Sequence, residues 1–181
     1  MIKLFFFDTE TTSLKDPHII QFAYMITDDT GNILETYNQY FTTVQEITKD
    51  STYIHGITPE KVIEEGLDPI IELPNIHQKM IECDKVISHN IDFDMKAISI
   101  TRKKLGLNTD IKYNTFCTMR KSKYFVGLYN DKGWIKWPKL IELYTFLGGE
   151  VSDVEDKLHD AMEDVKVLKE CFFLAKSKGY W

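Results

Sequence analysis

The hydrophobic residues at the start of the chain form a short continuous run, and the next two hydrophobic segments flank a turn. Apart from Lys3, the residues from Ile2 to Phe7 are all apolar or aromatic. This run is too short for a helix and is typical of a fully buried strand. Residues 19–27 and 33–41 surround an Asp-Asp-Thr-Gly-Asn segment at 28–32, whose composition favours a hairpin turn. We therefore expect three antiparallel strands, with the first at the centre of its sheet.

From residue 58 onward the pattern predicts helices alternating with short strands. Thr58 before Pro59 fits a helix N-cap followed by proline at the first helical position. Helices are expected at about 59–66, 73–82, 91–105 and 158–178, with another from Pro138 to Gly148. Strands are expected at 85–88 and 112–117, and a loop at 124–136. This order predicts an α/β fold with a mixed five-stranded sheet, in a single domain covering residues 1–181.

Composition argues against a membrane-spanning, secreted or disulfide-rich protein. No apolar run is long enough to span a bilayer, we expect no signal peptide, and three dispersed cysteines exclude a CxxC zinc site or a disulfide framework. We therefore expect a soluble, cytoplasmic protein without a membrane partner. The net charge of −6, from 22 Lys and Arg against 28 Asp and Glu, speaks at first against a nucleic-acid partner, because such domains are usually basic.

Two carboxylates, Asp8 and Glu10, come directly after the expected first strand. Residues i and i+2 of an extended chain point to the same face, so these carboxylates would lie side by side. That arrangement is costly unless a cation or a proton lies between them. The polar run that follows, Thr11 to Ser13, fits a functional site and a structural turn equally well.

Two histidines each have an aspartate five residues later: His89 with Asp94, and His159 with Asp164. Five residues correspond to about 500° of helix, so the pair cannot share one helical face as the ligands of a zinc protease do. The spacing suits an aspartate that holds an ion and a histidine that acts from the preceding loop. Asp160, which would share a helical face with Asp164, is the competing partner. A structural role is expected for the other histidines, His18, His55 and His77.

No serine or cysteine lies in a nucleophile motif, and no glycine-rich phosphate loop is present. Covalent catalysis and Walker-type nucleotide hydrolysis therefore have no support. What remains is a set of four carboxylates and one histidine from three distant segments: Asp8, Glu10, Asp94, Asp164 and His159. Oxygen ligands of this kind favour magnesium or manganese over zinc.

These motifs resemble those of the DEDD-type (DnaQ-like) 3′–5′ exonucleases. The matching residues are Asp8-x-Glu10, then His89-Asn90-x-x-Phe93-Asp94, then a His159-x-x-x-x-Asp164 motif that is similar to the histidine-containing (DEDDh) subgroup. The segments Phe6–Thr12 and Ile54–Thr58 are also similar to that family. In one departure, this chain has Ser13 where the family often has glycine.

The resemblance implies a ribonuclease-H-like fold with helices on both faces of the sheet, two divalent ions (Mg²⁺ or Mn²⁺) and release of nucleoside monophosphates from a 3′ end. By the same resemblance, the ions would be held by Asp8, Glu10, Asp94 and Asp164, and His159 would be the general base. The residues implied near the terminal nucleotide are Thr11, Leu14 and Phe93, with Asn90 and His55 in support.

The leading expectation is an exonuclease that acts on single-stranded DNA. Proofreading or repair is one role open to it, the sequence does not decide the role, and any polymerase involved would be a separate chain. The alternatives are an exoribonuclease that trims RNA 3′ ends, since the 2′-hydroxyl contact is not readable from sequence, and a non-catalytic nucleic-acid-binding domain. Clustered negative charge argues against the last. Two bound divalent ions would bring the charge from −6 to −2, so an acidic chain does not exclude this substrate.

Two groups of basic and aromatic residues are expected to contact nucleic acid. The alternative for each group is that its basic side chains are solvated at the surface and its aromatic side chains belong to the core. The first is the segment Arg120–Phe125, and the second comprises Lys132, Lys136 and Lys139 around Trp134 and Trp137.

Overall fold

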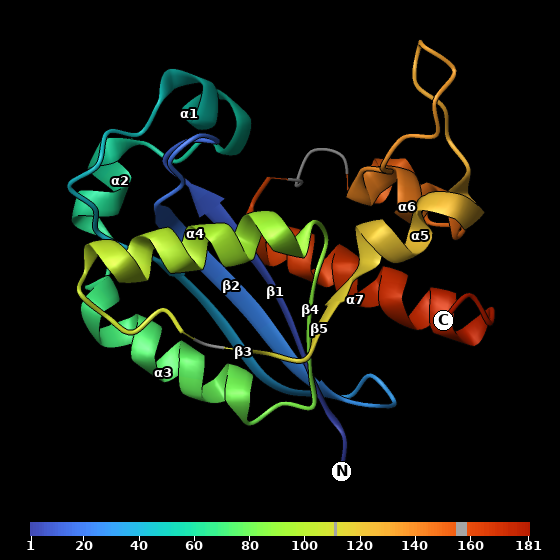
Figure 1. Cartoon of the computed structure of the whole chain (residues 1–181), viewed down its shortest axis with the longest axis horizontal. Helices are drawn as coiled ribbons and strands as arrows, with labels where there is room; N and C mark the ends of the chain where they lie inside the picture. The colour runs from blue at the N-terminus through green and yellow to red at the C-terminus, as the bar shows by residue number, and fades with distance from the viewer. Residues whose placement is uncertain (111, 155–158) are drawn as a thin grey trace.

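A five-stranded mixed sheet forms the centre of the computed structural model, which describes residues 1–110, 112–154 and 159–181 (Figure 1). The strands are β1 (Lys3–Thr11), β2 (Ile19–Asp28), β3 (Ile33–Tyr40), β4 (Lys85–Ser88) and β5 (Thr115–Cys117). Their spatial order is β3-β2-β1-β4-β5, with β1 to β3 antiparallel and β4 and β5 parallel to β1. The expected α/β class, the mixed sheet and the central position of the first strand are confirmed.

Strand β1 is longer than the apolar run that predicted it. It continues through Asp8 and Glu10, which lie opposite Ala23 and Gln21 of β2. Pairing with β2 keeps this polar end extended, which hydrophobic patterning alone does not reveal. Both carboxylates are thus placed by a central strand rather than by a following loop, and they lie on the same face as expected.

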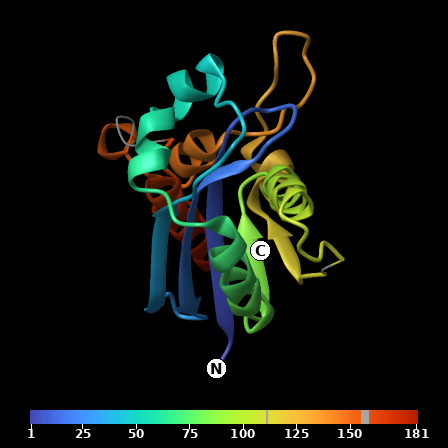
Figure 2. The same cartoon turned by 90° about the vertical axis from the view of Figure 1, so that its left-hand side faces the viewer.

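Helices cover both faces of the sheet (Figures 1 and 2). Phe5 and Phe7 of β1 pack on one face with residues of α3 (Pro69–Ile81) and α4 (Ile91–Lys104). Leu4 and Phe6 point to the other face and pack against α7 (Ala161–Ser177). Alternate residues of β1 therefore belong to two separate apolar layers. Asp8 and Glu10 continue the series that faces α7.

Several helix boundaries follow from local capping signals. Helix α2 (Pro59–Glu64) begins as expected, and its Thr58 side chain accepts from the backbone N–H of Lys61 at 3.3 Å. Helix α3 begins at Pro69 rather than near residue 73, because Asp68 caps it and Pro69 takes the first position, which repeats the Thr58-Pro59 signal.

Two short helices were not expected from the sequence. They are α1 (Lys49–His55), which ends at Gly56 with φ of 70°, and α5 (Thr118–Val126), which ends at Gly127 with φ of 65°. Neither is long enough to show a clear apolar period. Because α5 extends to residue 126, the expected loop at 124–136 was wrong at its start.

The remaining elements are close to expectation. Helix α6 (Leu140–Phe146) follows Pro138, and β5 is shorter than the expected strand at 112–117. The expected helix start at Leu158 lies outside the described residues, and α7 begins at Ala161. A short 3-10 helix spans Val151–Asp153. Within the described ranges, no helix has both the length and the apolar character needed to cross a membrane.

Candidate active site

Three carboxylates converge at the end of β1. Asp8 and Glu10 of β1 and Asp164 in the first turn of α7 each offer an oxygen, and these oxygens lie within 4.8 Å of one another. The contact between α7 and the sheet, through Phe6 and Leu168 among others, brings the first and last motifs together. The structure thus joins these three sequence-predicted residues in one cluster.

Among the described residues, the charges that act on Asp8 and Glu10 are all those of neighbouring carboxylates. Burial, together with repulsion from Asp94, Asp164 and Glu10, raises the pKa of Asp8 well above its ordinary value. Burial and the neighbouring carboxylates raise the pKa of Glu10 to about 9, and burial is the main cause that raises the pKa of Asp164 to about 7. Among the described residues, Oδ1 of Asp164 is buried without a hydrogen-bond partner. An unpartnered oxygen among clustered carboxylates fits a divalent cation.

Asp94 lies beside this cluster rather than within it. It is 3% exposed in the first turn of α4, and it accepts hydrogen bonds from Thr9 Oγ1 at 2.8 Å and Ser88 Oγ at 2.5 Å. Burial raises the pKa of Asp94 to about 7, although both hydroxyl groups act in the opposite direction. Its charge raises the pKa of Asp8 and Glu10, so it belongs to the same electrostatic site.

His159 lies in the turn just before α7, as its spacing from Asp164 predicted. Its φ of 72° is uncommon for a residue with a side chain, and its ring is exposed. Partial removal from water and the nearby Lys139 ammonium hold the pKa of His159 below its ordinary value. The ring is therefore neutral at pH 7 and can accept a proton.

Asp160 has a different role from Asp164. Its side chain caps α7 by accepting from the backbone N–H groups of Met162 at 3.0 Å and Glu163 at 3.3 Å. It also accepts a hydrogen bond of 2.9 Å from Gln21. Asp160, considered from sequence as the competing partner of Asp164, is thus engaged in capping the helix.

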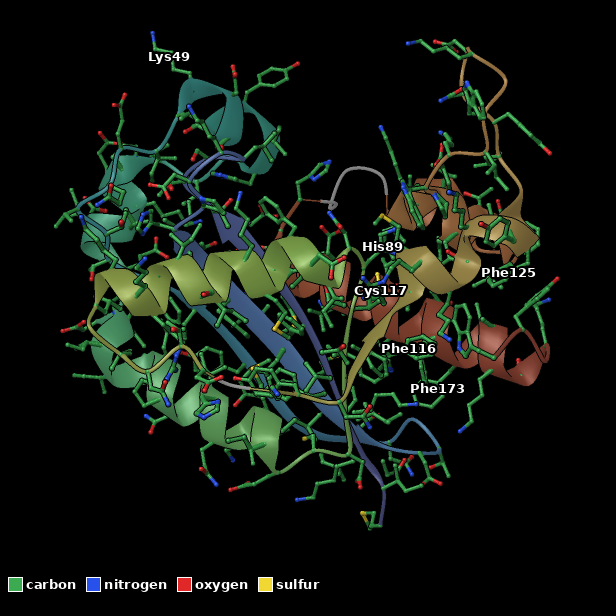
Figure 3. The ribbon with its side chains drawn as sticks, viewed as in Figure 1. Lys49, His89, Phe116, Cys117, Phe125 and Phe173 are labelled. Carbon is green, nitrogen blue, oxygen red and sulfur yellow. The ribbon has the colours of Figure 1, made fainter. Side chains whose placement is uncertain are left out.

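His89 is not equivalent to His159, despite the same spacing to an aspartate. Its Nε2–H donates to the Pro138 carbonyl at 2.9 Å, and its Nδ1 lies 3.0 Å from the Thr118 hydroxyl. Burial lowers the pKa of His89 to about 4. With both nitrogens engaged, this ring joins the end of β4 to α5 and to the segment before α6 (Figure 3).

The residues expected near the substrate lie around the end of β1 and the start of α4. Thr11 is buried, Leu14 is 74% exposed, and Phe93 is half-buried in α4. His55 Nε2–H donates to the Thr11 carbonyl at 3.2 Å, and His55 Nδ1 accepts from the Ile57 backbone N–H at 3.0 Å. His55 therefore holds the end of α1 against the end of β1, which supports the expected structural role.

The turn after β1 does not need glycine. Ser13 is not among the described non-glycine residues with positive φ, which are Asn90 and His159. The Ser13 hydroxyl donates to the Asp16 carbonyl at 3.0 Å. Asn90 takes a left-handed conformation at the start of α4, which asparagine tolerates. The other structural histidines, His18 and His77, contact Asp16 and Tyr113.

Gln21 was missed at the sequence level. It is completely buried on β2, opposite Glu10, and its Nε2 donates to Asn38 at 3.0 Å as well as to Asp160. Its carbonyl oxygen lies 3.4 Å from the Ala161 backbone N–H. A lone amide within the apolar run 19–26 was the available signal, because a buried polar group needs partners.

The first expected basic cluster does not form one surface. Arg120 pairs with Asp92 at 2.6 Å. Lys121 lies over the Phe116 ring at 5.8 Å, whereas Lys123 lies over Trp137 at 4.0 Å. The two lysine side chains thus lie against different aromatic rings, on different parts of the surface.

Comparison with known proteins places this chain in a family. The exonuclease family model (RNase T) matches residues 5–172, and no curated protein matches the sequence. Solved structures with the same fold include Escherichia coli exonuclease I in complex with a dA16 oligonucleotide, with a TM-score of 0.81 and 20% identity over 99% of this chain and 42% of that one.

Two further solved structures are similar to this chain in fold. Exonuclease I from Methylocaldum szegediense has a TM-score of 0.78 and 18% identity, and covers 99% of this chain and 41% of that one. A zinc-bound form of the E. coli exonuclease I–ssDNA complex has a TM-score of 0.79 and 19% identity, with the same coverage of 99% and 41%. The chain thus spans about two fifths of the length of these proteins. The fold is the ribonuclease-H-like exonuclease fold, and the chain belongs to the DEDD-type exonuclease family.

Proposed function

We propose that this chain is a metal-dependent 3′–5′ exonuclease that releases nucleoside monophosphates from single-stranded DNA. The observation that carries this proposal is the meeting of Asp8, Glu10 and Asp164, with one unpartnered buried oxygen, at the start of the helix that His159 precedes. Structures of E. coli exonuclease I with dA16 and dT13 oligonucleotides support the choice of substrate. The family match over residues 5–172 supports one exonuclease domain across residues 1–181.

The carboxylates would hold two divalent ions, Mg²⁺ or Mn²⁺. Such ions neutralise phosphodiester charge and lower the pKa of bound water. Asp8, Glu10 and Asp164 are the ligands that the geometry supports most directly, and Asp94 completes the set. Asp8 would be a ligand held in place by the central strand, close to the other carboxylates, whose charges together with burial raise its pKa.

His159 would act as the general base. Its neutral ring nitrogen would take a proton from the attacking water. Partial burial, and after it the Lys139 charge, lower the pKa of His159 and so favour the unprotonated ring at neutral pH. His159 takes a left-handed backbone conformation in the turn before α7, while Asp164 lies in the first turn of that helix. This division of labour matches the DEDDh subgroup in the last motif.

Substrate contacts would come from both sides of the carboxylates. Leu14, exposed on the turn after β1, and Phe93, on the first turn of α4, would flank the terminal nucleotide. Thr11 would contribute its backbone, with His55 holding that backbone in place, and Asn90 would shape the start of α4. These roles follow the family resemblance.

DNA proofreading or repair beside a separate polymerase chain is the role we propose for this activity. A cytoplasmic location is supported by the three thiols, Cys83, Cys117 and Cys171, which are all free.

A time course with single-stranded oligonucleotides tests the activity. DNA and RNA of the same sequence, labelled at the 3′ or the 5′ end, are incubated with Mg²⁺, Mn²⁺ or a chelator. Immediate release of the 3′ label as a mononucleotide from DNA, only with metal, is expected, and an Asp8→Asn variant should release none. Faster release from RNA would favour the exoribonuclease, and release from the 5′ end would overturn the proposal.

A further inference from the structure

The segment between α5 and α6, residues 127–139, forms an arm that projects from the body of the protein (Figures 1 and 2). Tyr129 and Ile135 form an antiparallel bridge within it. At its tip, the Asn130 backbone N–H donates to the Trp134 carbonyl at 2.9 Å, and Gly133 takes a φ of 75°. These bonds give the arm a defined conformation before any ligand binds.

The arm presents large aromatic side chains to solvent. Trp134 is 72% exposed, Tyr129 68% and Trp137 49%. The Lys123 ammonium lies 4.0 Å from the centre of the Trp137 ring, so a cation and an aromatic ring share the base of the arm. Exposed tryptophan and tyrosine rings grouped on one projecting segment suit a ligand with flat aromatic groups.

The charge of this region is opposite to that of the whole chain. Residues 118–139 contain six Lys or Arg and a single acidic residue, Asp131, in a chain of net charge −6. Within the described residues, Lys123, Lys132 and Lys139 take part in no side-chain ion pair. These cations are therefore available to an anionic partner.

The base of the arm lies at the candidate active site. The Pro138 carbonyl accepts from the His89 ring, which follows β4 and precedes the helix that carries Asp94. Lys139, the last residue of the arm, is close enough to lower the pKa of His159. A strand with its end among the carboxylates would thus leave the site beside the arm.

We propose that the arm is a stacking platform for the bases of a single-stranded nucleic acid, a few nucleotides away from the end held by the carboxylates. This inference rests on the proposed function for its choice of ligand. Aromatic rings stack on any base, and lysines neutralise the backbone, so the platform is sequence-tolerant. It selects single strands, because the faces of paired bases are covered by their neighbours in a duplex.

The test compares Tyr129→Ala/Trp134→Ala with Tyr53→Ala, a control on α1 whose ring is 92% exposed. Dissociation constants for a fluorescent single-stranded oligothymidylate are measured at low salt with a chelator present. The arm variant should bind about 5- to 150-fold more weakly for each stacked base lost, whereas the control should bind like the wild type. Quenching of Trp134 fluorescence by the oligonucleotide should disappear in the arm variant.

A second readout separates the arm from the chemistry. The p-nitrophenyl ester of thymidine 5′-monophosphate is too short to reach the arm, so the arm variant should hydrolyse it at the wild-type rate. For the oligonucleotide, KM should rise in the arm variant and kcat should stay unchanged. Unchanged oligonucleotide affinity, or an equal loss of affinity for blunt duplex DNA, would overturn the platform. Arm-dependent binding by a wild-type protein that hydrolyses nothing would sustain the platform and overturn the proposed exonuclease.

Discussion

The side-chain amide of Gln21 donates a hydrogen bond of 2.9 Å to the carboxylate of Asp160, which caps α7. Gln21 lies opposite Glu10 in the β1–β2 register, and Asp164 lies in the first turn of α7. One buried amide thus ties the strand pair that carries Glu10 to the helix that carries Asp164. This bond adds to the apolar contact between α7 and the sheet in setting the separation of the carboxylates.

Replacement of Gln21 by alanine should loosen this connection. The buried Ala161 N–H and the half-buried Asp160 carboxylate would each lose a partner, and an unpaired buried group costs about 1–3 kcal/mol in the free energy of unfolding. We also expect a higher Mg²⁺ concentration at half-maximal hydrolysis. Denaturant unfolding and a Mg²⁺ titration measure both effects. The matched control is Gln39→Ala on β3, whose side chain makes no hydrogen bond among the described residues; equal behaviour of the two variants would contradict the prediction.

Asp164→Asn should abolish hydrolysis and leave a folded protein. In a chelator at about pH 8 the variant should be more stable than the wild type, because it removes one of several buried like charges. The rise in melting temperature that Mn²⁺ produces in the wild type should shrink. Thermal unfolding with and without Mn²⁺ measures this. Glu163→Gln is the control, since Glu163 pairs with Lys166 and is not one of the three clustered carboxylates; loss of the Mn²⁺ effect there would point to a non-specific cation response.

The stability of the metal-free protein should fall as pH rises. Folding raises the pKa of Glu10 to about 9 and of Asp94 and Asp164 to about 7, above unfolded values near 4. The folded state then binds more protons than the unfolded state across this window, so the free energy of unfolding decreases with rising pH. Melting temperatures in a chelator should be lower at about pH 8.5 than at about pH 5.5, and Mg²⁺ should stabilise more at the higher pH. A melting temperature that increases with pH would refute this account.

His159→Ala should lower turnover by roughly 100- to 10,000-fold, the range for loss of a general base. Metal binding should survive, because His159 is not one of the clustered carboxylates. The stabilisation by Mn²⁺ in thermal unfolding tests the second point, and the rate across about pH 6–9 tests the first. Wild-type rates over that range would exclude the base assignment.

Lys123→Ala should reduce the salt dependence of single-strand binding, whereas Lys121→Ala should not. Lys123 faces Trp137 at the base of the arm, and Lys121 faces Phe116. Loss of one phosphate contact lowers the slope of log affinity against log salt by about 0.7. Fluorescence anisotropy at several salt concentrations measures the slope. The same slope in both variants would remove Lys123 from the binding surface.

Local patterns predicted much of this protein. The apolar run before Asp8 indicated the central strand, and the spacing around Thr58 and Pro59 indicated a helix start at the residue where one begins. The order of the motifs predicted the carboxylates and His159 as the site residues, and the structure brings Asp8, Glu10 and Asp164 together. These features depend on neighbours in the chain, so a period of two or a capping spacing records them directly.

Tertiary structure decided what each polar group does. His89 and His159 have the same spacing to an aspartate. The His89 ring contacts Thr118 and Pro138, whereas His159 is exposed. The burial of Gln21, the capping by Asp160 and the projection of the arm also depend on segments far apart in sequence. The sequence by itself determined which groups could do chemistry and which strands would be central. The folded chain determined their partners, because hydrogen bonds, burial and charge depend on distances in space that residue spacing does not encode.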